Sequence, residues 1–262
     1  MRTIKFSKGD KYKGNLILVN GLWPLQNDEK PPCVPILDQF PSVLLHIKAS
    51  ACLRQILKTI DAADSIVPVS GYRPLAEQEE IYRDSLTENG TEFTEKFVAK
   101  PGCSEHQSGL AIDLGEKADY IDFICPDFPN KGICAEFRKL ASKYGFIQRY
   151  TGEKETVTRI ACEPWHFRYV GYPHSEVMEN LGLCLEEYIE YLKAFPAGAK
   201  ALKLRCGARQ IQISYANEAV SEMQVSDNAI VEVSGNNIDG CIVTVWEKNR
   251  RQGAGFLILF SL

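Results

Sequence analysis

The sequence predicts an α+β fold followed by a small β-rich C-terminal appendage. Apolar residues between Val43 and Ile60 recur at three- and four-residue steps, which is the spacing of an amphipathic helix. Short runs that alternate or are rich in β-branched residues, such as Ile66–Ser70 and Trp165–Tyr169, are typical of strands. Beyond residues 195–198 the helical spacing gives way to strand-like stretches separated by turn signals.

The N-terminal third begins with an extended stretch. The short apolar runs of residues 1–36 are broken by glycine and proline, so no regular element is predicted there. A helix follows over residues 43–60, and Ile66–Ser70 is interpreted as a buried strand that ends at a glycine. Pro74 suits the first position of a second helix, which continues over residues 75–86.

The middle of the chain alternates between helices and strands. A short helix is predicted over residues 93–98, because a Pro-Gly pair follows it, and a longer one over residues 135–143. Residues 109–114 and 165–169 alternate as strands do, with the aromatic residues of the second strand on one face. Residues 174–192 are mostly helical in their spacing.

The break at residues 195–198 predicts a domain boundary. We expect residues 1–195 to form the catalytic domain and residues 196–262 to form a β-rich extension of unknown role. Residues 255–262 are unusually apolar, which fits either an added strand or an end that binds a partner. Three stretches of the extension predict strands: 209–215, 229–233 and 241–246.

Composition limits the class of protein. The 262 residues are 45% hydrophobic, which suffices for a substantial core. The net charge is −4, and lysine and arginine are scattered, so nucleic acid is not an expected partner. Nine cysteines, an odd number with no CxxC pair, favour a reducing compartment over a disulfide framework. No apolar run approaches a membrane span, and the run at residues 16–19 is too short for a signal peptide. With Met1 as the native start, these features predict a cytoplasmic protein.

Two short segments carry the chemistry. SEHQSGLAID, from Ser104 to Asp113, and EPWH, from Glu163 to His166, together provide two imidazoles and a carboxylate. His106, Asp113 and His166 are the ligand set of a hydrolytic zinc site with one position left for water, at one Zn²⁺ per chain. Glu163 is the expected general base, because the proline after it favours an extended backbone beside the metal.

Each segment alone has a simpler interpretation. A histidine near an aromatic strand is usually a core or surface residue, and an aspartate on a strand often caps a turn. The occurrence of both segments in one chain favours the metal site, because a strand aspartate is costly to bury without a partner cation. Cys103 and Cys162 lie close enough for thiolate ligation, although small buried side chains are the favoured interpretation. His46 and His174 are assigned no ligand role.

Arg73 follows the predicted strand at residues 66–70 on a tight turn. Two roles are open to it on the sequence. Its guanidinium could stabilise a developing oxyanion, where a fixed charge contributes strongly to lowering the barrier. Alternatively, it could be a surface residue that caps the turn.

These motifs resemble a known group of enzymes. SGYRP with Gln78 five residues after the arginine, then SEHQSGLAID, then EPWH, is similar to the VanY/VanXY-type D-alanyl-D-alanine peptidases, relatives of the lysostaphin-like enzymes and the hedgehog signalling domain. The resemblance covers about residues 10–195, and SGNNIDGCIVTVW in the tail looks like the end of VanXY proteins of the G type. It implies a central antiparallel sheet with flanking helices.

The resemblance also implies roles for individual residues. His106, Asp113 and His166 match the zinc ligands of the family, Glu163 its general base and Arg73 its transition-state-stabilising arginine. Two further residues match positions that contact substrate: Ser104 and Gln78.

The implied activity is zinc-dependent hydrolysis of D-Ala-D-Ala. The substrate would be the end of peptidoglycan precursors, the free dipeptide or both, which links the protein to glycopeptide resistance or wall metabolism. An endopeptidase of assembled wall and a non-catalytic metal-binding module are the alternatives. The balance between dipeptidase and carboxypeptidase activity depends on the rim of the site, expected at residues 87–103.

Overall fold

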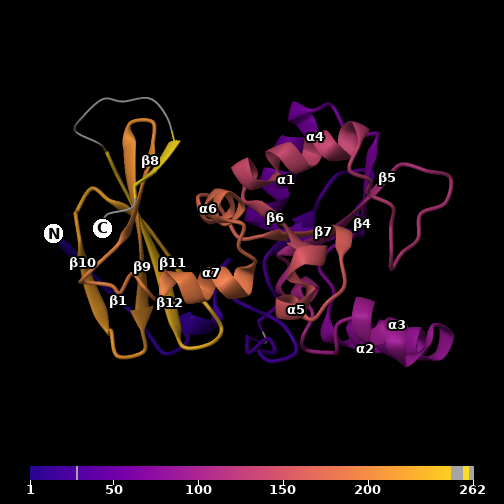
Figure 1. Ribbon diagram of the computed structural model, residues 1–262, viewed down its shortest axis with the longest axis horizontal. Helices are drawn as coiled ribbons and strands as arrows, with labels where there is room; N and C mark the ends of the chain where they lie inside the picture. Colours follow the sequence, from indigo (N-terminus) through magenta and orange to yellow (C-terminus); the bar gives the residue numbers. More distant parts are fainter. Residues whose placement is uncertain (28, 249–255, 260–262) are drawn as a thin grey trace. The chain divides into compact units, whose positions relative to one another are not determined.

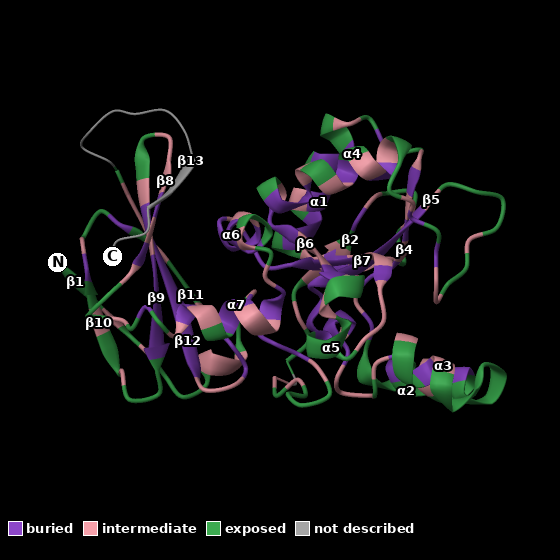
Figure 2. Ribbon diagram, viewed as in Figure 1, coloured by how far each residue is buried: buried purple, intermediate pink, exposed green. Residues whose placement is uncertain are grey.

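The computed structural model describes residues 1–27, 29–248 and 256–259, which fall into two compact units (Figure 1). The larger unit is continuous in sequence and spans Val19–Cys184. The smaller unit combines Met1–Leu18 with Leu185–Leu262. Each unit has its own sheet and its own buried side chains (Figure 2), so each is described separately.

A four-stranded sheet lies at the centre of the larger unit. Its order is β4–β5–β7–β6, and every neighbouring pair is antiparallel. The strands are β4 (Ile66–Ser70), β5 (Ala111–Glu116), β6 (Phe146–Tyr150) and β7 (Glu163–Tyr169). Mixed helices and antiparallel sheets confirm the predicted α+β class.

Two helices, α1 (Ile47–Thr59) and α4 (Gly132–Ala141), pack beside each other and supply the core of this unit (Figure 1). The ring of Phe137 on α4 lies 4.9 Å from that of Phe167 on β7, and both side chains are fully buried. Because strand side chains alternate between faces, packing Phe167 against the helix turns its neighbour His166 toward the other face. The core therefore fixes the face on which the polar residues of β5 and β7 lie.

The larger unit contains a further pair of helices and several short elements. α2 (Leu75–Glu88) and α3 (Gly90–Phe97) pack on each other, joined by a buried hydrogen bond between the hydroxyls of Ser85 and Thr94, at 2.8 Å. The others are β2 (Cys33–Pro35), β3 (Leu44–His46), α5 (Glu155–Thr158), α6 (His174–Leu181) and the 3₁₀ turns η2 (Glu105–Ser108), η3 (Ser142–Tyr144) and η4 (Gly152–Lys154).

The helix expected over residues 43–60 starts later than predicted. Residues 44–46 form strand β3, which pairs with β2, and helix α1 begins at Ile47. His46 caps that helix, because its Nδ1 accepts a hydrogen bond from the Lys48 backbone N–H at 3.3 Å. The apolar spacing runs unbroken through both elements, so periodicity alone does not mark the boundary.

The smaller unit is a β structure. Its five-stranded sheet has the order β11–β12–β9–β8–β13, and a two-stranded ribbon joins β1 to β10. Its strands are β1 (Arg2–Lys5), β8 (Leu202–Cys206), β9 (Arg209–Asn217), β10 (Glu222–Val225), β11 (Ile230–Gly235), β12 (Gly240–Lys248) and β13 (Phe256–Leu259).

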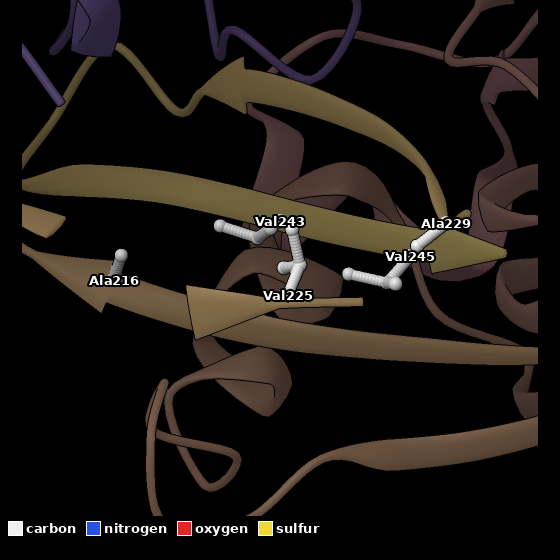
Figure 3. Close-up of a cluster of buried hydrophobic side chains, with 5 residues drawn as sticks. All are labelled: Ala216, Val225, Ala229, Val243 and Val245. Atoms are coloured by element: carbon white, nitrogen blue, oxygen red, sulfur yellow. The ribbon is translucent and has the colours of Figure 1, made fainter. Parts of the chain in front are cut away.

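Figure 3 shows a cluster of small side chains at the centre of this unit. Val243 and Val245 on β12 meet Ala216 of β9, Val225 of β10 and Ala229, and all five are buried. The partly buried Ile4 of β1 packs against the same cluster, which explains why a strand from the far N-terminus belongs here.

The two units differ from the predicted division in two places. Residues 1–18 join the smaller unit, because β1 pairs antiparallel with β10 and the 3₁₀ turn η1 (Asp10–Tyr12) contacts β11. The boundary lies after Cys184, earlier than residue 195, because α7 (Leu185–Leu192) contacts β9.

The apolar C-terminal stretch is described only in part. Residues 256–259 form β13, which pairs with β8, whereas residues 255 and 260–262 lie outside the described residues. Of the helices in the described ranges, none combines the length and the apolar character needed to cross a membrane.

Candidate metal and catalytic site

Three predicted ligands from different elements meet in the larger unit. His106 lies in η2, Asp113 on β5 and His166 on β7, and all three are buried. Asp113 bridges the two imidazoles: its Oδ2 lies 3.1 Å from Nε2 of His106 and its Oδ1 2.9 Å from Nδ1 of His166. One ligand atom from each residue falls within 4.8 Å of the others, which is close enough to share one metal ion.

Sheet register brings these residues together across more than fifty positions of sequence. Asp113 stands directly opposite His166 in the β5–β7 pair, and on its other side it is opposite Ser70 of β4. His106 reaches the same place through a turn at Gly109, whose φ of +69° is left-handed. A side chain at Gly109 would also collide with Sγ of Cys33, 2.6 Å from its Cβ position.

The second nitrogen of His106 is held by a hydrogen bond. Its Nδ1 donates to the carbonyl of Gly71 at 2.7 Å. A carbonyl can only accept, so the proton sits on Nδ1 and the lone pair of Nε2 faces Asp113. That is the tautomer required of a metal-binding imidazole, and it is fixed before any metal arrives.

Glu105 orients the ring of His166, and here the opposite ring nitrogen, Nδ1, faces Asp113. Its Nε2 lies 3.5 Å from Oε2 of Glu105, which leaves Nδ1 on the side of Asp113. A carboxylate behind a ligating histidine raises its basicity and fixes its ring. Two imidazole nitrogens, each on a ring that an outer partner holds, and one carboxylate therefore form a donor set that fits zinc.

Glu105 lies at the centre of a buried ionic cluster. Its Oε1 accepts hydrogen bonds from Nε of Arg149 at 2.8 Å and from Nη1 of Arg168 at 2.7 Å, and all three side chains are buried. Although burial itself opposes ionisation, the two guanidinium groups hold the pKa of Glu105 well below its usual range. Sequence reasoning missed this cluster, although Glu105 precedes a predicted ligand and Arg168 follows another by two residues on the same strand face.

Glu163 begins strand β7 beside the three ligands. Its Oε2 lies 3.6 Å from Nδ1 of His166, and its side chain is 7% exposed. Burial raises the pKa of Glu163 to about 8; His166 opposes this rise, whereas the Asp113 carboxylate adds to it. A carboxyl group whose pKa is raised toward neutrality is suited to accept and return a proton.

Arg73 is buried against the site and not at the surface. Its Nη1 donates to Oε1 of Gln78 at 2.7 Å and its Nη2 to Oγ of Ser70 at 2.8 Å, with Asp113 3.8 Å away. Its buried Nε has no hydrogen-bond partner among the described residues. A fixed guanidinium with a donor left over is the arrangement that an oxyanion-stabilising residue needs.

Gln78 stands behind Arg73. Its Oε1 accepts from Arg73, its Nε2 donates to the carbonyl of Ala99 at 2.7 Å, and the residue is 1% exposed. Both ends of the carboxamide thus point at the protein. The geometry favours an orienting role for Gln78 over the substrate contact expected from the sequence.

The predicted residues converge on one cavity of about 50 Å³, called here the catalytic cavity. Ser104 is buried in its wall, and Tyr150 and Trp165 are among the aromatic residues that line it. Of the predicted site residues, Gln78 alone does not line the catalytic cavity. The predicted residues that do line it are Arg73, Ser104, His106, Asp113, Glu163 and His166.

Other candidate ligands lie elsewhere. Neither Cys103 nor Cys162 belongs to the metal-binding group found among the described residues, and burial raises the pKa of the Cys103 thiol. All nine cysteines are free thiols. His46 caps α1, and His174 is buried at the start of α6.

Comparison with known proteins agrees with this geometry. Residues 42–172 match the VanY family, described as D-alanyl-D-alanine carboxypeptidase. The chain is 41% identical over 181 residues, 68% of its length and 94% of the relative, to the bifunctional D-Ala-D-Ala dipeptidase and carboxypeptidase VanXYC of Enterococcus gallinarum.

Solved structures extend the likeness to both units. The D,D-dipeptidase VanXYg, solved with a D-Ala-D-Ala phosphinate analogue, is 46% identical, with a TM-score of 0.91 over 94% of this chain and 99% of that one. A mutant of the D,D-pentapeptidase VanY in complex with Zn(II) is 29% identical, with a TM-score of 0.55 over 67% of this chain and 98% of that one. Because the family match and the similarity to these relatives agree with the fold and the motifs, the chain belongs to the VanY family of D-alanyl-D-alanine carboxypeptidases.

Proposed function

We propose that this protein is a zinc-dependent peptidase that hydrolyses the D-Ala-D-Ala bond, both in the free dipeptide and at the end of peptidoglycan precursors. The observation that carries the proposal is the convergence of His106, Asp113 and His166 with Glu163 and Arg73 on one cavity. The bifunctional relative and the phosphinate-bound dipeptidase support the choice of substrate.

The residues divide the reaction between them. Zinc, when held by His106, Asp113 and His166, supplies Lewis-acid polarisation and lowers the pKa of water toward ~7. Glu163 takes the proton of the water that attacks the scissile carbonyl and returns it to the leaving amine. Arg73, held by Ser70 and Gln78, places its guanidinium charge beside the carbonyl oxygen, where negative charge develops.

The biological setting follows from the substrate. Removal of the terminal D-Ala destroys the target of glycopeptide antibiotics, so we place this activity in glycopeptide resistance. A cytoplasmic location would give the enzyme access to precursors before they are exported.

Substrate choice gives the direct test. Purified protein with zinc is incubated with D-Ala-D-Ala, with a precursor pentapeptide and with intact cell wall, and release of D-alanine is measured. Hydrolysis of both soluble substrates supports the proposal. Cleavage of wall alone would replace it with the endopeptidase, and metal binding without any hydrolysis would replace it with the non-catalytic module.

Metal removal is expected to abolish activity reversibly. Dialysis against a chelator should reduce D-alanine release to background, and added Zn²⁺ should restore it, because three ligands converge on one position. His166→Ala should not be rescued at the same zinc concentration, whereas His46→Ala, which alters a histidine outside the group, should behave as wild type. Zinc should also raise the melting temperature of wild-type protein, since a ligand of the folded state stabilises it. Full activity in a metal-free sample would contradict the assignment.

Replacing Arg73 is expected to slow turnover more than it weakens binding. Arg73→Lys keeps a positive charge but loses the planar fork that bonds Gln78 and Ser70 at once. We expect kcat on the dipeptide to fall about 10²- to 10³-fold, the loss typical of one oxyanion donor. Steady-state kinetics measure this, and Arg83→Lys, an exposed arginine on α2, is the matched control. A kcat within a fewfold of wild type would assign Arg73 a structural role.

A further inference from the structure

A second cavity adjoins the catalytic cavity and has no role in the mechanism above. It measures about 400 Å³ and is lined by residues 20–22, 98–100 and 157–160 together with Glu95, Cys103 and Tyr150. It is called here the outer groove. All of these residues belong to the larger unit, and the second segment lies in the rim that the sequence analysis expected.

The two cavities share a wall. Four residues line both of them: Val98, Ala99, Tyr150 and Ile160. Tyr150 stands opposite Glu163 in the β6–β7 pair, and its ring lies 5.0 Å from that of His166. The outer groove therefore begins next to the base and one metal ligand, so a chain bound at the site can continue into it.

The direction of the groove follows from the reaction. An enzyme that removes the last residue has a single residue on the leaving side of the scissile bond. Every further residue of a longer substrate lies on the acyl side. A cavity that is several times larger than the catalytic one and shares part of its lining can therefore serve only the acyl side of the substrate.

The walls of the outer groove combine apolar surface with positive charge. Leu22 and Val157 are 61% and 39% exposed and supply apolar surface to the groove. Lys100 and Arg159 are both exposed and form no ion pair with any residue of the described ranges, and Glu95 is the one acidic residue in the lining. Two cations against one anion favour a ligand that carries a carboxylate.

Arg159 is held in a backbone conformation that few residues adopt. Its φ of +61° is left-handed, and its N–H caps helix α5 by donating to the carbonyl of Glu155. Glycine or asparagine would occupy this position at lower energetic cost. An arginine at this position therefore carries a backbone cost, which contact of its side chain with a ligand in the groove would offset.

We propose that the outer groove binds the acyl-side residues of peptide substrates, and that Lys100 and Arg159 pair with a carboxylate two or three residues before the scissile bond. The inference rests on the proposed peptidase function and adds a site for the longer substrate. It explains how one catalytic cavity can serve both the dipeptide, which ends before the groove, and the precursor, which extends into it.

The test compares substrates that differ only in what reaches the groove. Zinc-loaded wild type and the double variant Lys100→Gln/Arg159→Asn are assayed on D-Ala-D-Ala and on L-Ala-γ-D-Glu-L-Lys-D-Ala-D-Ala. A third substrate is the same pentapeptide with the free carboxylate of its second residue converted to an amide. Asparagine is chosen at position 159 because it tolerates the left-handed backbone. Lys96→Gln, which removes a lysine of α3 outside the groove lining, is the matched control.

We expect KM for the acidic pentapeptide to rise about three- to tenfold in the double variant, as for two exposed ion pairs. Its kcat, and both constants for the dipeptide, should stay within twofold of wild type. The amidated pentapeptide should already show the raised KM with wild type, and added salt should narrow the difference. Lys96→Gln should change none of these values.

Two failures are distinguishable. If the wild type cleaves both substrates and the double variant matches it on the acidic pentapeptide, the groove assignment is overturned while the peptidase stands. The same holds if the dipeptide suffers as much as the pentapeptide. If the zinc-loaded wild type cleaves none of the substrates, the peptidase proposal falls and the groove assignment falls with it.

Discussion

Glu163→Gln is expected to lower kcat on D-Ala-D-Ala by about 10²- to 10⁴-fold, the range for loss of a general acid–base residue. Glutamine keeps the shape of the side chain but can neither take a proton from water nor return one. Glu163 lies outside the three-residue ligand group, so the variant should bind zinc as the wild type does. D-alanine release measures the first effect, and metal content after gel filtration measures the second.

The role of Glu163 is decided by kcat and zinc content together, and not by the loss of kcat alone. An inactive variant that has also lost its zinc would show that Glu163 supports the metal. An active variant would remove the assignment of Glu163 as the base. Glu116→Gln, an acidic residue at the end of β5 that does not line the catalytic cavity, is a suitable control for a carboxylate in the same unit.

Glu105→Gln is expected to cost about 3–5 kcal/mol of folding stability, because it removes a buried carboxylate that accepts hydrogen bonds from two buried guanidinium groups. Arg149 and Arg168 are both within 1% of complete burial, so water cannot replace the carboxylate without rearrangement of the core. The same change removes the carboxylate charge behind His166, which should weaken zinc binding about 10- to 100-fold. Urea unfolding of the metal-free protein and competition with a zinc chelator measure the two effects separately.

The control is an ion pair of similar length at the surface. Glu136 accepts from Nζ of Lys139 at 2.7 Å on helix α4, and both side chains are more than half exposed. Glu136→Gln should cost less than about 1 kcal/mol, since water screens such pairs. Equal losses for Glu105→Gln and Glu136→Gln would show that the buried cluster contributes little beyond its packing. A Glu105→Gln protein with unchanged zinc affinity would remove its role in orienting His166.

Most of the polar residues that line the catalytic cavity could be predicted from the sequence, whereas most of the residues that hold them in place could not. The expected ligands and base lie in two short motifs whose residue types are those of a zinc site. His106, Asp113, His166 and Glu163 could therefore be predicted from the sequence. Their catalytic roles stay predictions until the variants are measured. Arg149 could not be named, because it reaches Glu105 from β6, a strand that the sequence analysis did not predict.

The fold, too, could be predicted only where a local sequence pattern determines the element. Strand β4 was predicted with its observed bounds, because a β-branched run followed by glycine is a local signal. The apolar spacing predicts a helix where strand β3 lies, because the identity of this strand depends on pairing with β2, about ten residues upstream. Gln78 is a comparable case: its motif indicates substrate contact, and only the position of Ala99 shows what its amide donates to.

The pairing of β1 with β10 has a consequence for the order of folding. Residues 19–184 form a unit that is continuous in sequence, so all of its residues leave the ribosome before the C-terminal strands are made. Strand β1 is synthesised first but has no partner until residues 222–225 emerge. The first segment to be synthesised is thus among the last to pair. Until β10 is made, the edges of β1 stay unpaired and open to contact with other chains.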